Sequence, residues 1–363
     1  MAIGLNLAEY LNQGAERLVR DVRRATLFNL KETAFLWRYG RSLKTMLRRR
    51  AMHQAQGHPI PMFLIASITN ACNLYCKGCY ARANGQCGGK SDAPLLTADE
   101  WGDVFAQAEA AGVGFILLAG GEPMLRHDVL TVAARHEGIL FPIFTNGTMI
   151  DPLMLSLLDQ HRNLVPVVSL EGGEASTDAR RGAGAYRRVQ ASLVKLSNRR
   201  LLFGVSLTVT TENRAEVMSP AFVRSLRQQG CRLVFYIEYV PATPGTESLA
   251  PDDAERLIMD HNLEELRASF PGMVFLSFPG DEKHMGGCLA AGRGFFHINA
   301  YGSAEPCPFS PYSISNIKNQ TLLEVIDSPF FQAVRELNAQ DCGHLGGCAL
   351  FEKEALVKSL LHP

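Results

Sequence analysis

The chain has 363 residues, 47% of them hydrophobic, and its 36 Lys and Arg balance its 36 Asp and Glu. This composition is typical of a folded globular protein with a sizeable core, and the lack of net charge argues against nucleic acid as a partner. Nine cysteines are many for a sequence that does not begin with a signal peptide, and no apolar stretch is long enough to span a bilayer. We therefore expect a cytoplasmic protein whose cysteines bind metal or take part in catalysis.

Basic charge is concentrated near the N-terminus, where residues 1–50 contain eleven Lys or Arg against four Asp or Glu. Residues 8–55 have the apolar spacing of amphipathic helices, and Gly57 and Pro59 end that pattern. The basic helical extension, residues 1–58, has three interpretations. It packs on the main domain, it lies on an anionic membrane surface, or it binds a partner or substrate peptide.

Residues 59–245 alternate between strand-like and helix-like segments, which predicts a parallel sheet with helices outside it, because parallel strands need crossover connections. The six predicted strands are 62–69, 114–119, 139–145, 164–170, 202–210 and 232–240. Helix starts are marked by a Thr97–Glu100 capping box and by Asp151-Pro152 and Ser219-Pro220. Six such units predict an α/β fold, a partial (β/α)6 parallel barrel with ligands at the C-terminal ends of its strands.

Three cysteines follow the first predicted strand: Cys72, Cys76 and Cys79, in a C-x3-C-x2-C pattern. Three thiolates can ligate a four-iron cluster and leave one iron open for a cofactor or substrate. A zinc knuckle or three unconnected core cysteines are the alternatives, since Cys-x2-Cys pairs also occur in zinc sites. Cys87, in a nearby flexible glycine-rich loop, is either a reactive thiol or an incidental cysteine, and Cys231 is expected in the core.

Short polar segments end the next three predicted strands. They are Gly120-Gly121-Glu122-Pro123, Thr145-Asn146-Gly147-Thr148 and Ser169-Leu170-Glu171-Gly172. A further segment contains Arg181, whose guanidinium suits a bidentate contact with a carboxylate. Each segment alone is an ordinary turn or surface ion pair as readily as a binding site, but one such segment per strand end predicts a shared site. Glu238, at the end of the sixth strand, is either a substrate contact or a solvated edge residue.

Four more cysteines lie in residues 246–363: Cys288, Cys307, Cys342 and Cys348. The first two flank a predicted hairpin at 295–302, and a helix predicted over 321–338 precedes the other two. Four thiolates can ligate a second four-iron cluster completely, and a structural zinc tetrahedron is the alternative. We expect a small C-terminal α+β cluster-binding extension here.

The first cysteine pattern and the strand-end segments resemble the radical S-adenosylmethionine (SAM) superfamily, and the late cysteines resemble its SPASM or twitch extension. The resemblance implies that Cys72, Cys76 and Cys79 hold a 4Fe–4S cluster whose open iron binds SAM, and that the four late cysteines hold an auxiliary 4Fe–4S cluster. It implies cofactor contacts from Tyr80, Gly120, Gly121, Glu122, Pro123, Thr145, Asn146, Ser169, Glu171 and Arg181. The end of the sixth strand, 237–239, would border the adenine. The sequence departs from the family at Gly78, where an aromatic residue usually precedes the third cysteine, and in having four late cysteines instead of seven.

For such a protein the resemblance implies reductive cleavage of SAM to a 5′-deoxyadenosyl radical, which abstracts hydrogen from a substrate. The first expected substrate is a peptide or protein side chain, oxidised or cross-linked with help from the auxiliary cluster. A small molecule, a lipid or a cofactor precursor near the membrane is the second expectation, and a non-catalytic iron–sulfur or zinc scaffold is the third. A one-electron donor such as flavodoxin or ferredoxin would be a partner. The protein would be cytoplasmic, with or without peripheral contact to the inner membrane face through residues 8–55.

Overall fold

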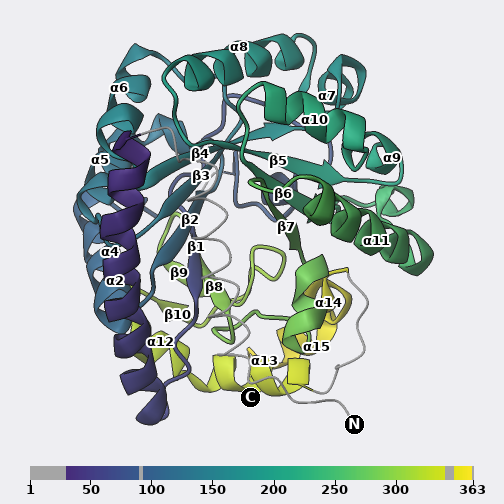
Figure 1. Cartoon of the computed structure of the whole chain (residues 1–363). Coiled ribbons are helices and arrows are strands. Elements are labelled where there is room, and N and C mark those ends of the chain that lie inside the picture. The colour runs from purple at the N-terminus through teal and green to yellow at the C-terminus, as the bar shows by residue number, and fades with distance from the viewer. Residues whose placement is uncertain (1–29, 90–92, 340–346, 362–363) are drawn as a thin grey trace.

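The computed structural model describes residues 30–89, 93–339 and 347–361, so part of the expected N-terminal helical extension lies outside it. Within these ranges the strands form one sheet in the order β10-β9-β8-β1-β2-β3-β4-β5-β6-β7. Six strands match the predicted ones: β1 Phe63–Ser67, β2 Phe115–Ala119, β3 Phe141–Thr145, β4 Leu164–Leu170, β5 Gly204–Val209 and β6 Leu233–Glu238. They pair in parallel, and helices cover the outer face of the curved sheet (Figure 1). The α/β partial barrel is therefore confirmed.

The crossover helices begin where the sequence predicts. α4 (Ala98–Ala111) opens on the Thr97–Glu100 capping box, with both reciprocal hydrogen bonds present. α6 (Pro152–Gln160) and α10 (Pro220–Gln228) begin with proline, and the polar side chain before it accepts a backbone N–H. The other helices around the barrel are α5 (His127–Arg135), α7 (Glu174–Arg181), α8 (Ala185–Asn198), α9 (Arg214–Val217) and α11 (Asp253–Ser269).

Further strands extend the sheet beyond the predicted six. They are β7 (Val274–Phe278), β8 (Phe295–Ile298), β9 (Ser303–Glu305) and β10 (Ser315–Asn316). β7 pairs in parallel with β6, and β8 pairs in parallel with β1, while β8 and β9 form the predicted hairpin. The rings of Phe278 on β7 and Phe295 on β8 lie 5.4 Å apart. The sheet therefore curls far enough for strands near its two ends to meet through side chains.

The C-terminal helices differ from the one helix predicted over 321–338. The Thr321–Glu324 capping box opens a short helix, α12 (Leu322–Ile326), which ends before Pro329. A second helix, α13 (Pro329–Ala339), begins at that proline, because proline cannot continue α12 but suits the first turn of a new helix. The prediction of one helix is therefore wrong. Two short helices, α14 (Ala349–Glu352) and α15 (Glu354–Ser359), follow.

The N-terminal helix α2 (Leu30–Ala55) closes the barrel at the N-terminal ends of its strands. Its buried side chains include Phe35 and Tyr39, which pack on inward-facing residues at the start of β6 and β7, such as Leu233 and Val274. α2 also packs against α4 (Figure 1). Among the three interpretations of the extension, packing on the main domain is therefore what α2 does. None of the described helices is long and apolar enough to cross a membrane.

A buried ion pair anchors the start of α2. Glu32 Oε1 accepts hydrogen bonds from Arg162 Nη1 at 2.7 Å and from Leu202 N at 3.0 Å. Both charged side chains are almost fully buried, and this burial raises the pKa of Glu32. The pair joins α2 to the loop after α6 and to the residues that lead into β5.

Replacing Glu32 with Ala is expected to lower the free energy of unfolding by about 1–3 kcal/mol, because Arg162 loses its buried partner and keeps only the partly exposed Asp159. Urea unfolding followed by circular dichroism measures the change. Glu137→Ala is the matched control, since Glu137 pairs with Arg38 at 3.7 Å in an exposed position. It should change the free energy by less than about 0.5 kcal/mol. Equal effects of the two substitutions would contradict the anchoring role of Glu32.

Candidate active site

A cavity of about 500 Å³ lies inside the barrel and extends from the cysteine loop at one end to α2 at the other. The wall at the cysteine-loop end contains all three cysteines of the C-x3-C-x2-C pattern. Six of the expected cofactor contacts line it as well: Tyr80, Gly120, Gly121, Asn146, Ser169 and Arg181. These residues come together because the carboxyl ends of parallel strands meet at one rim of a barrel.

The two glycines at the end of β2 allow direct backbone contact with the cysteine loop. A Cβ atom on Gly120 would lie 2.3 Å from Thr69 O, and one on Gly121 would lie 2.0 Å from Ala71 O. The backbone N–H groups of Gly121 and Glu122 donate to these same two carbonyls, at 2.9 and 2.8 Å. Any larger residue would push the loop away. The glycines therefore determine where the loop that carries Cys72 starts.

Glu122 and Thr145, two of the expected contacts, lie behind the cavity wall. The fully buried Glu122 carboxylate accepts hydrogen bonds from Thr145 Oγ1 at 2.8 Å, Asn146 N at 2.7 Å and Met124 N at 3.0 Å. Burial raises the pKa of Glu122 to about 7. Asn146 Nδ2 in turn donates to Asn73 Oδ1 in the cysteine loop, at 2.7 Å. Glu122 thus positions a cavity residue and, through it, the loop.

Glu171 and Pro123 also lie behind the wall. Glu171 Oε1 accepts hydrogen bonds from Arg180 Nη1 and Arg181 Nε, both at 2.8 Å, and its Oε2 accepts none among the described residues. Both arginines line the cavity. Lys77 N donates to Arg180 O at 2.8 Å, which fixes the middle of the cysteine loop. The carboxylate expected opposite Arg181 is therefore found within the protein itself.

Cys87 is buried and lines the cavity, and its thiol lies beside that of Cys72. The neighbouring Cys87 thiol lowers the pKa of Cys72 below its usual range. The turn that carries Cys87 is held by hydrogen bonds from Cys87 N to Ala81 O at 2.8 Å and from Gly88 N to Asn70 O at 2.9 Å. The turn brings this side chain back beside the first three cysteines, and whether Cys87 is a reactive thiol or an incidental cysteine stays a prediction. The glycines around Cys87 do not show from the sequence that the chain turns back toward the first three cysteines.

Three of the four late cysteines converge, and Cys342 lies outside the described residues. Cys288 follows the 3-10 helix η3 (Gly280–Met285), Cys307 follows β9, and Cys348 is the N-cap residue of α14. Cys307 lies beside Cys348, and Cys288 lies near both. Burial raises the pKa of Cys288 and Cys307 well above the usual range. These thiols would ionise only beside compensating positive charge, which the irons of a cluster provide.

Both sets of cysteines offer the kind of donor that iron–sulfur clusters use. Within the described ranges, no group of three His, Cys, Asp or Glu side chains is arranged to hold one metal ion. In a four-iron cluster the thiolates bind separate irons, so their sulfur atoms need not converge on one point. The donor sets consist of cysteine alone, and the first set faces a cavity with room for a cofactor. The residues present therefore fit the two groups that the sequence resemblance implies.

Direct contacts join the segment that follows Cys79 to the segment that follows Cys307. Tyr80 opens the short helix α3 (Tyr80–Ala83) directly after Cys79, and its ring lies 4.8 Å from the ring of Phe309. Asn84 Nδ2 donates to Pro308 O at 3.0 Å. Pro308 and Phe309 follow Cys307 and line the cavity together with the first three cysteines. The segment after the third cysteine is thus packed on the segment after Cys307.

A buried hydrogen-bonded chain continues this connection toward β1. Gln86 Nε2 donates to Glu305 Oε2 at 2.7 Å, and His297 Nδ1 lies 2.7 Å from the same oxygen. His297 Nε2 lies 2.7 Å from Ser67 Oγ at the end of β1. Ser67, His297 and Glu305 are buried and do not line the cavity, so this chain supports the loop from behind.

Comparison with known proteins identifies the family. Residues 66–219 match the radical SAM superfamily, and residues 288–349 match the SPASM iron–sulfur cluster-binding domain. The chain is a radical SAM enzyme with a SPASM domain. Its cofactors are accordingly SAM, the 4Fe–4S cluster that binds SAM, and an auxiliary iron–sulfur cluster.

Relatives of this radical SAM enzyme have different named activities. The AdoMet-dependent heme synthase of Methanosarcina barkeri is 27% identical over 292 residues, which cover 73% of this chain and 82% of the relative. Mycofactocin maturase MftC of Mycolicibacterium smegmatis is 26% identical over 314 residues, 81% of this chain and 78% of the relative. Among solved structures, SuiB of Streptococcus suis bound to SAM has a TM-score of 0.67 at 18% identity, covering 92% of this chain and 83% of that one. This last likeness shows the shared fold.

Tyr239, after β6, occupies the space that a side chain at Gly78 would need. Gly78 has a φ of +63°, and a Cβ atom there would lie 2.4 Å from Tyr239 Oη. Tyr239 lines the cavity, and its buried hydroxyl has no hydrogen-bond partner among the described residues. An unsatisfied buried hydroxyl beside a cavity is available to a bound cofactor. The resemblance implies that 237–239 border the adenine, but the sequence gives no sign of the contact with Gly78.

Glu238 is not the solvated edge residue that the sequence allows. Its side chain is 3% exposed and lines the cavity, and its Oε1 accepts a hydrogen bond at 2.7 Å from Arg256 Nε of α11. A charged side chain on an apolar strand is tolerated in the interior when a partner of opposite charge is also present. The other interpretation, a substrate contact, stays a prediction.

Replacing Gly78 with Ala is expected to reduce loading of the first cluster, because the new methyl group collides with Tyr239 and the backbone is strained at positive φ. Iron and sulfide bound per chain after anaerobic reconstitution measure the loss. A second substitution, Tyr239→Leu, should restore part of the loading by removing the colliding ring.

Gly85→Ala is the matched control for this experiment. Gly85 lies just after α3 with a φ of +69°, but a Cβ atom there would meet nothing within 4 Å. It should therefore lose only the backbone contribution, about 1–2 kcal/mol of stability. Equal losses of cluster from Gly78→Ala and Gly85→Ala would show that the packing of Tyr239 on Gly78 is unimportant.

Proposed function

We propose that this enzyme oxidises or cross-links a peptide or protein side chain. When bound, SAM and its cluster supply hydrogen-atom abstraction through reductive cleavage of SAM, and the auxiliary cluster supplies a one-electron acceptor. The protein itself holds the reacting carbon of the substrate beside the cofactor and keeps water away from it. The partly apolar, enclosed wall of the cavity suits that task.

One observation supports the proposal most directly. The first three cysteines and residues adjacent to the auxiliary cysteines line the same cavity: Pro308 and Phe309 follow Cys307, and Leu289 follows Cys288. A substrate bound there would lie between the two cluster sites. An electron released after hydrogen abstraction would then have a short path to the auxiliary site, and the net reaction would be an oxidation.

The residue roles are part of this proposal. Cys72, Cys76 and Cys79 ligate the first cluster, and Cys288, Cys307, Cys342 and Cys348 ligate the second. The residues on the cavity wall contact SAM: Tyr80, Gly120, Gly121, Asn146, Ser169 and Arg181. Four residues hold that wall from behind: Glu122, Pro123, Thr145 and Glu171. We divide the chain into a helical extension (1–58), a radical SAM core (59–245) and the auxiliary-cluster region (246–363).

The nature of the substrate is supported by the relatives. Those named as maturases favour a peptide or protein, whereas the heme synthase favours a second candidate, a small molecule or lipid. The second candidate also has a structural observation in its favour, namely the apolar lining of the cavity below the cysteines. The substrate itself can be sought as material that co-purifies with the protein from anaerobic cells.

Anaerobic reconstitution with iron and sulfide, followed by SAM and dithionite, should yield 5′-deoxyadenosine. Replacing Cys72, Cys76 or Cys79 with Ala should reduce this product to background, because each loses a ligand of the cluster that binds SAM. Cys348→Ala should retain SAM cleavage and lose turnover of the substrate. Cys231→Ala is the control, since Cys231 is a fully buried core thiol away from both sites. A wild-type chain with full iron that forms no product, or one that binds zinc alone, would refute the enzyme proposal.

We further propose that a one-electron donor such as flavodoxin or ferredoxin serves the enzyme in the cytoplasm, and that α2 contacts the inner membrane face. Exposed residues recur along one face of α2 at spacings of three and four: Trp37, Arg41, Lys44, Arg48 and Met52. The Arg41 guanidinium lies 5.1 Å from the centre of the Trp37 ring. Glu32, the only acidic residue of α2, is buried. A cationic face with an interfacial tryptophan is typical of helices that lie on anionic lipid.

Trp37 offers a direct test of this contact, because the other tryptophan, Trp101, is fully buried. Vesicles that contain phosphatidylglycerol should shift the emission of Trp37 to the blue, and vesicles of phosphatidylcholine alone should not. Exchanging Arg41, Lys44 and Arg48 together for Gln should weaken binding by about 100-fold, at about 1 kcal/mol per charge.

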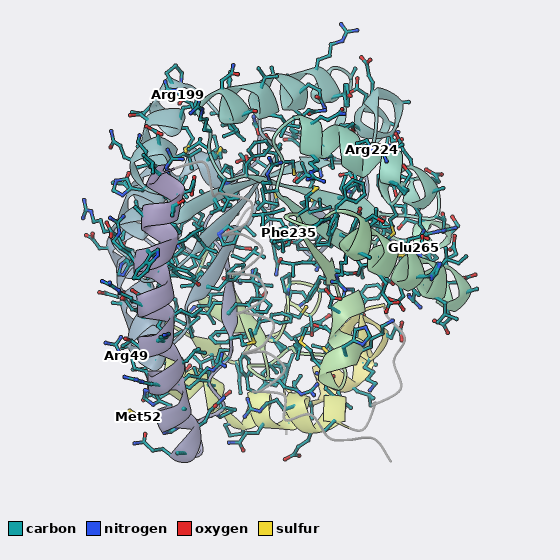
Figure 2. All side chains as sticks on the ribbon, in the orientation of Figure 1. Arg49, Met52, Arg199, Arg224, Phe235 and Glu265 are labelled. Atoms are coloured by element: carbon teal, nitrogen blue, oxygen red, sulfur yellow. The ribbon has the colours of Figure 1, made fainter. Side chains whose placement is uncertain are left out.

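A triple exchange of Arg188, Arg199 and Arg224 for Gln is the matched control, since it removes the same charge from α8, the turn after it, and α10. Arg199 and Arg224 lie well away from the lower half of α2, where Arg49 and Met52 are labelled (Figure 2). This control should leave vesicle binding unchanged. Equal weakening by both triple exchanges would mean that overall charge, and not the face of α2, carries the interaction.

A further inference from the structure

The inner face of the barrel exposes apolar side chains to the cavity. On β2 the inward-facing Phe115 and Leu117 are partly exposed, while the outward-facing Ile116 and Leu118 are fully buried under the helices. The inward-facing residues line the cavity, so their exposed surface faces its interior and not the solvent. Barrel interiors of this kind are ordinarily filled by layers of side chains. Here the layer near α2 leaves apolar space unfilled.

The floor of this space is a fixed part of the fold. Tyr39 Oη donates to Gly114 O at 2.9 Å, which ties α2 to the residue before β2. A Cβ atom on Gly112 would lie 2.4 Å from Met46 O, so α2 and the chain before β2 are in close contact. The ion pair of Glu32 with Arg162 holds the start of the helix. The space above α2 is therefore enclosed by anchored elements.

The chemistry of the wall changes along the cavity. Hydroxyl groups, those of Ser169 and Thr208, lie at the C-terminal ends of β4 and β5, near the cysteines. The part near α2, which we name the lower cavity, is lined by Leu43, Leu47, Phe115, Phe235, Leu276 and Phe278. Arg50, a buried charged residue of α2, lines the cavity as well. Figure 2 labels Phe235 near the centre of the sheet. A ligand that spans both parts would have a polar end at the cysteines and an apolar end at α2.

We propose that the lower cavity binds an elongated hydrocarbon group of the substrate. The proposal rests on the proposed function, because it assigns the substrate of that same site to a chemical class. The whole cavity, about 500 Å³, is within the range of small-molecule sites, about 300–1,000 Å³. Burial of hydrocarbon there would hold a neighbouring C–H bond beneath the cysteine loop. The group could be the acyl or prenyl chain of an amphiphile or a large apolar side chain of a peptide, and the experiment below separates these sources.

The test measures binding by the anaerobically purified full chain, independently of its catalytic activity. The fluorescent fatty acid cis-parinarate is titrated in, and it is then displaced by hexanoate, octanoate, decanoate and dodecanoate. Parinarate should bind saturably, one molecule per chain. Each added methylene should strengthen displacement by about fourfold until the lower cavity is full, which is the gain expected for burial of one CH₂ group. In the second arm, N-acetyl-leucine amide and N-acetyl-phenylalanine amide are tested for displacement of parinarate in the same way.

Leu47→Trp fills the lower cavity and should weaken parinarate binding at least tenfold. Thr45→Trp is the matched control, since it adds the same ring to the exposed face of the same helix, and it should leave binding unchanged. Leu276→Trp adds a ring to the same space from β7, and it replaces Leu47→Trp in the test if that variant does not fold. SAM binding, measured by equilibrium dialysis, should be the same in all of these variants, because the substituted positions lie away from the cysteine loop.

Stronger displacement by the longer fatty acids than by the amides supports an amphiphile as the source, and stronger displacement by the amides supports an apolar side chain. Absence of saturable binding would overturn the proposal, as would an affinity independent of chain length or equal effects of Leu47→Trp and Thr45→Trp. The assay of 5′-deoxyadenosine on the same preparation tests the proposed function separately. A chain that binds hydrocarbon but does not cleave SAM refutes that function and leaves the site in place, and the reverse result refutes the site alone.

Discussion

Direct backbone contact between the cysteine loop and the end of β2 is the constraint on which the rest of the site depends. The loop has little regular structure of its own, so its shape comes from what surrounds it. Gly120 and Gly121 allow the start of the loop to lie on the β2 backbone. Arg180 holds its middle, and the hairpin residue Glu305 holds the turn that ends near Cys87. Each support comes from a different strand or helix, so the three thiols face one cavity only when the whole barrel has formed.

Buried carboxylates perform much of this support. Glu122 and Glu171 do not reach the cavity, yet each collects hydrogen bonds from residues that do. Their burial carries a desolvation cost, which the donors around them offset. Such an arrangement places Asn146 and the two arginines rigidly, and rigid placement is what a radical reaction needs to keep its reacting carbon in position. The helix α2 contributes in the same way at the opposite end, where it encloses the cavity and presents a cationic face outward.

Much of the fold could be predicted because its signals are local. Parallel strands that are buried on both faces appear as continuous apolar runs, and the runs at 164–170 and 232–240 differ from β4 and β6 by no more than two residues at either end. Helix starts follow from capping side chains and prolines, as at Thr97 and Ser219. The predictions failed where distant contacts decide. Strand β7 is as long as β1, β2 and β3, but its pairing with β6 was not predicted. Cys87 enters the cavity through a turn that its glycines made look flexible.

The sequence by itself determined the order of the strands and helices and which residue types stand at each strand end, because apolar periodicity, caps and cysteine spacing are properties of neighbouring residues. Only the tertiary structure decided which of those residues face the cavity. Asn146 and Arg181 lie on its wall while Glu122 and Glu171 lie behind it, and Tyr239 takes the space that Gly78 leaves free. The physical reason is that facing a cavity or supporting its wall depends on how strands far apart in the chain curl and pack, and short sequence segments carry no information about that packing.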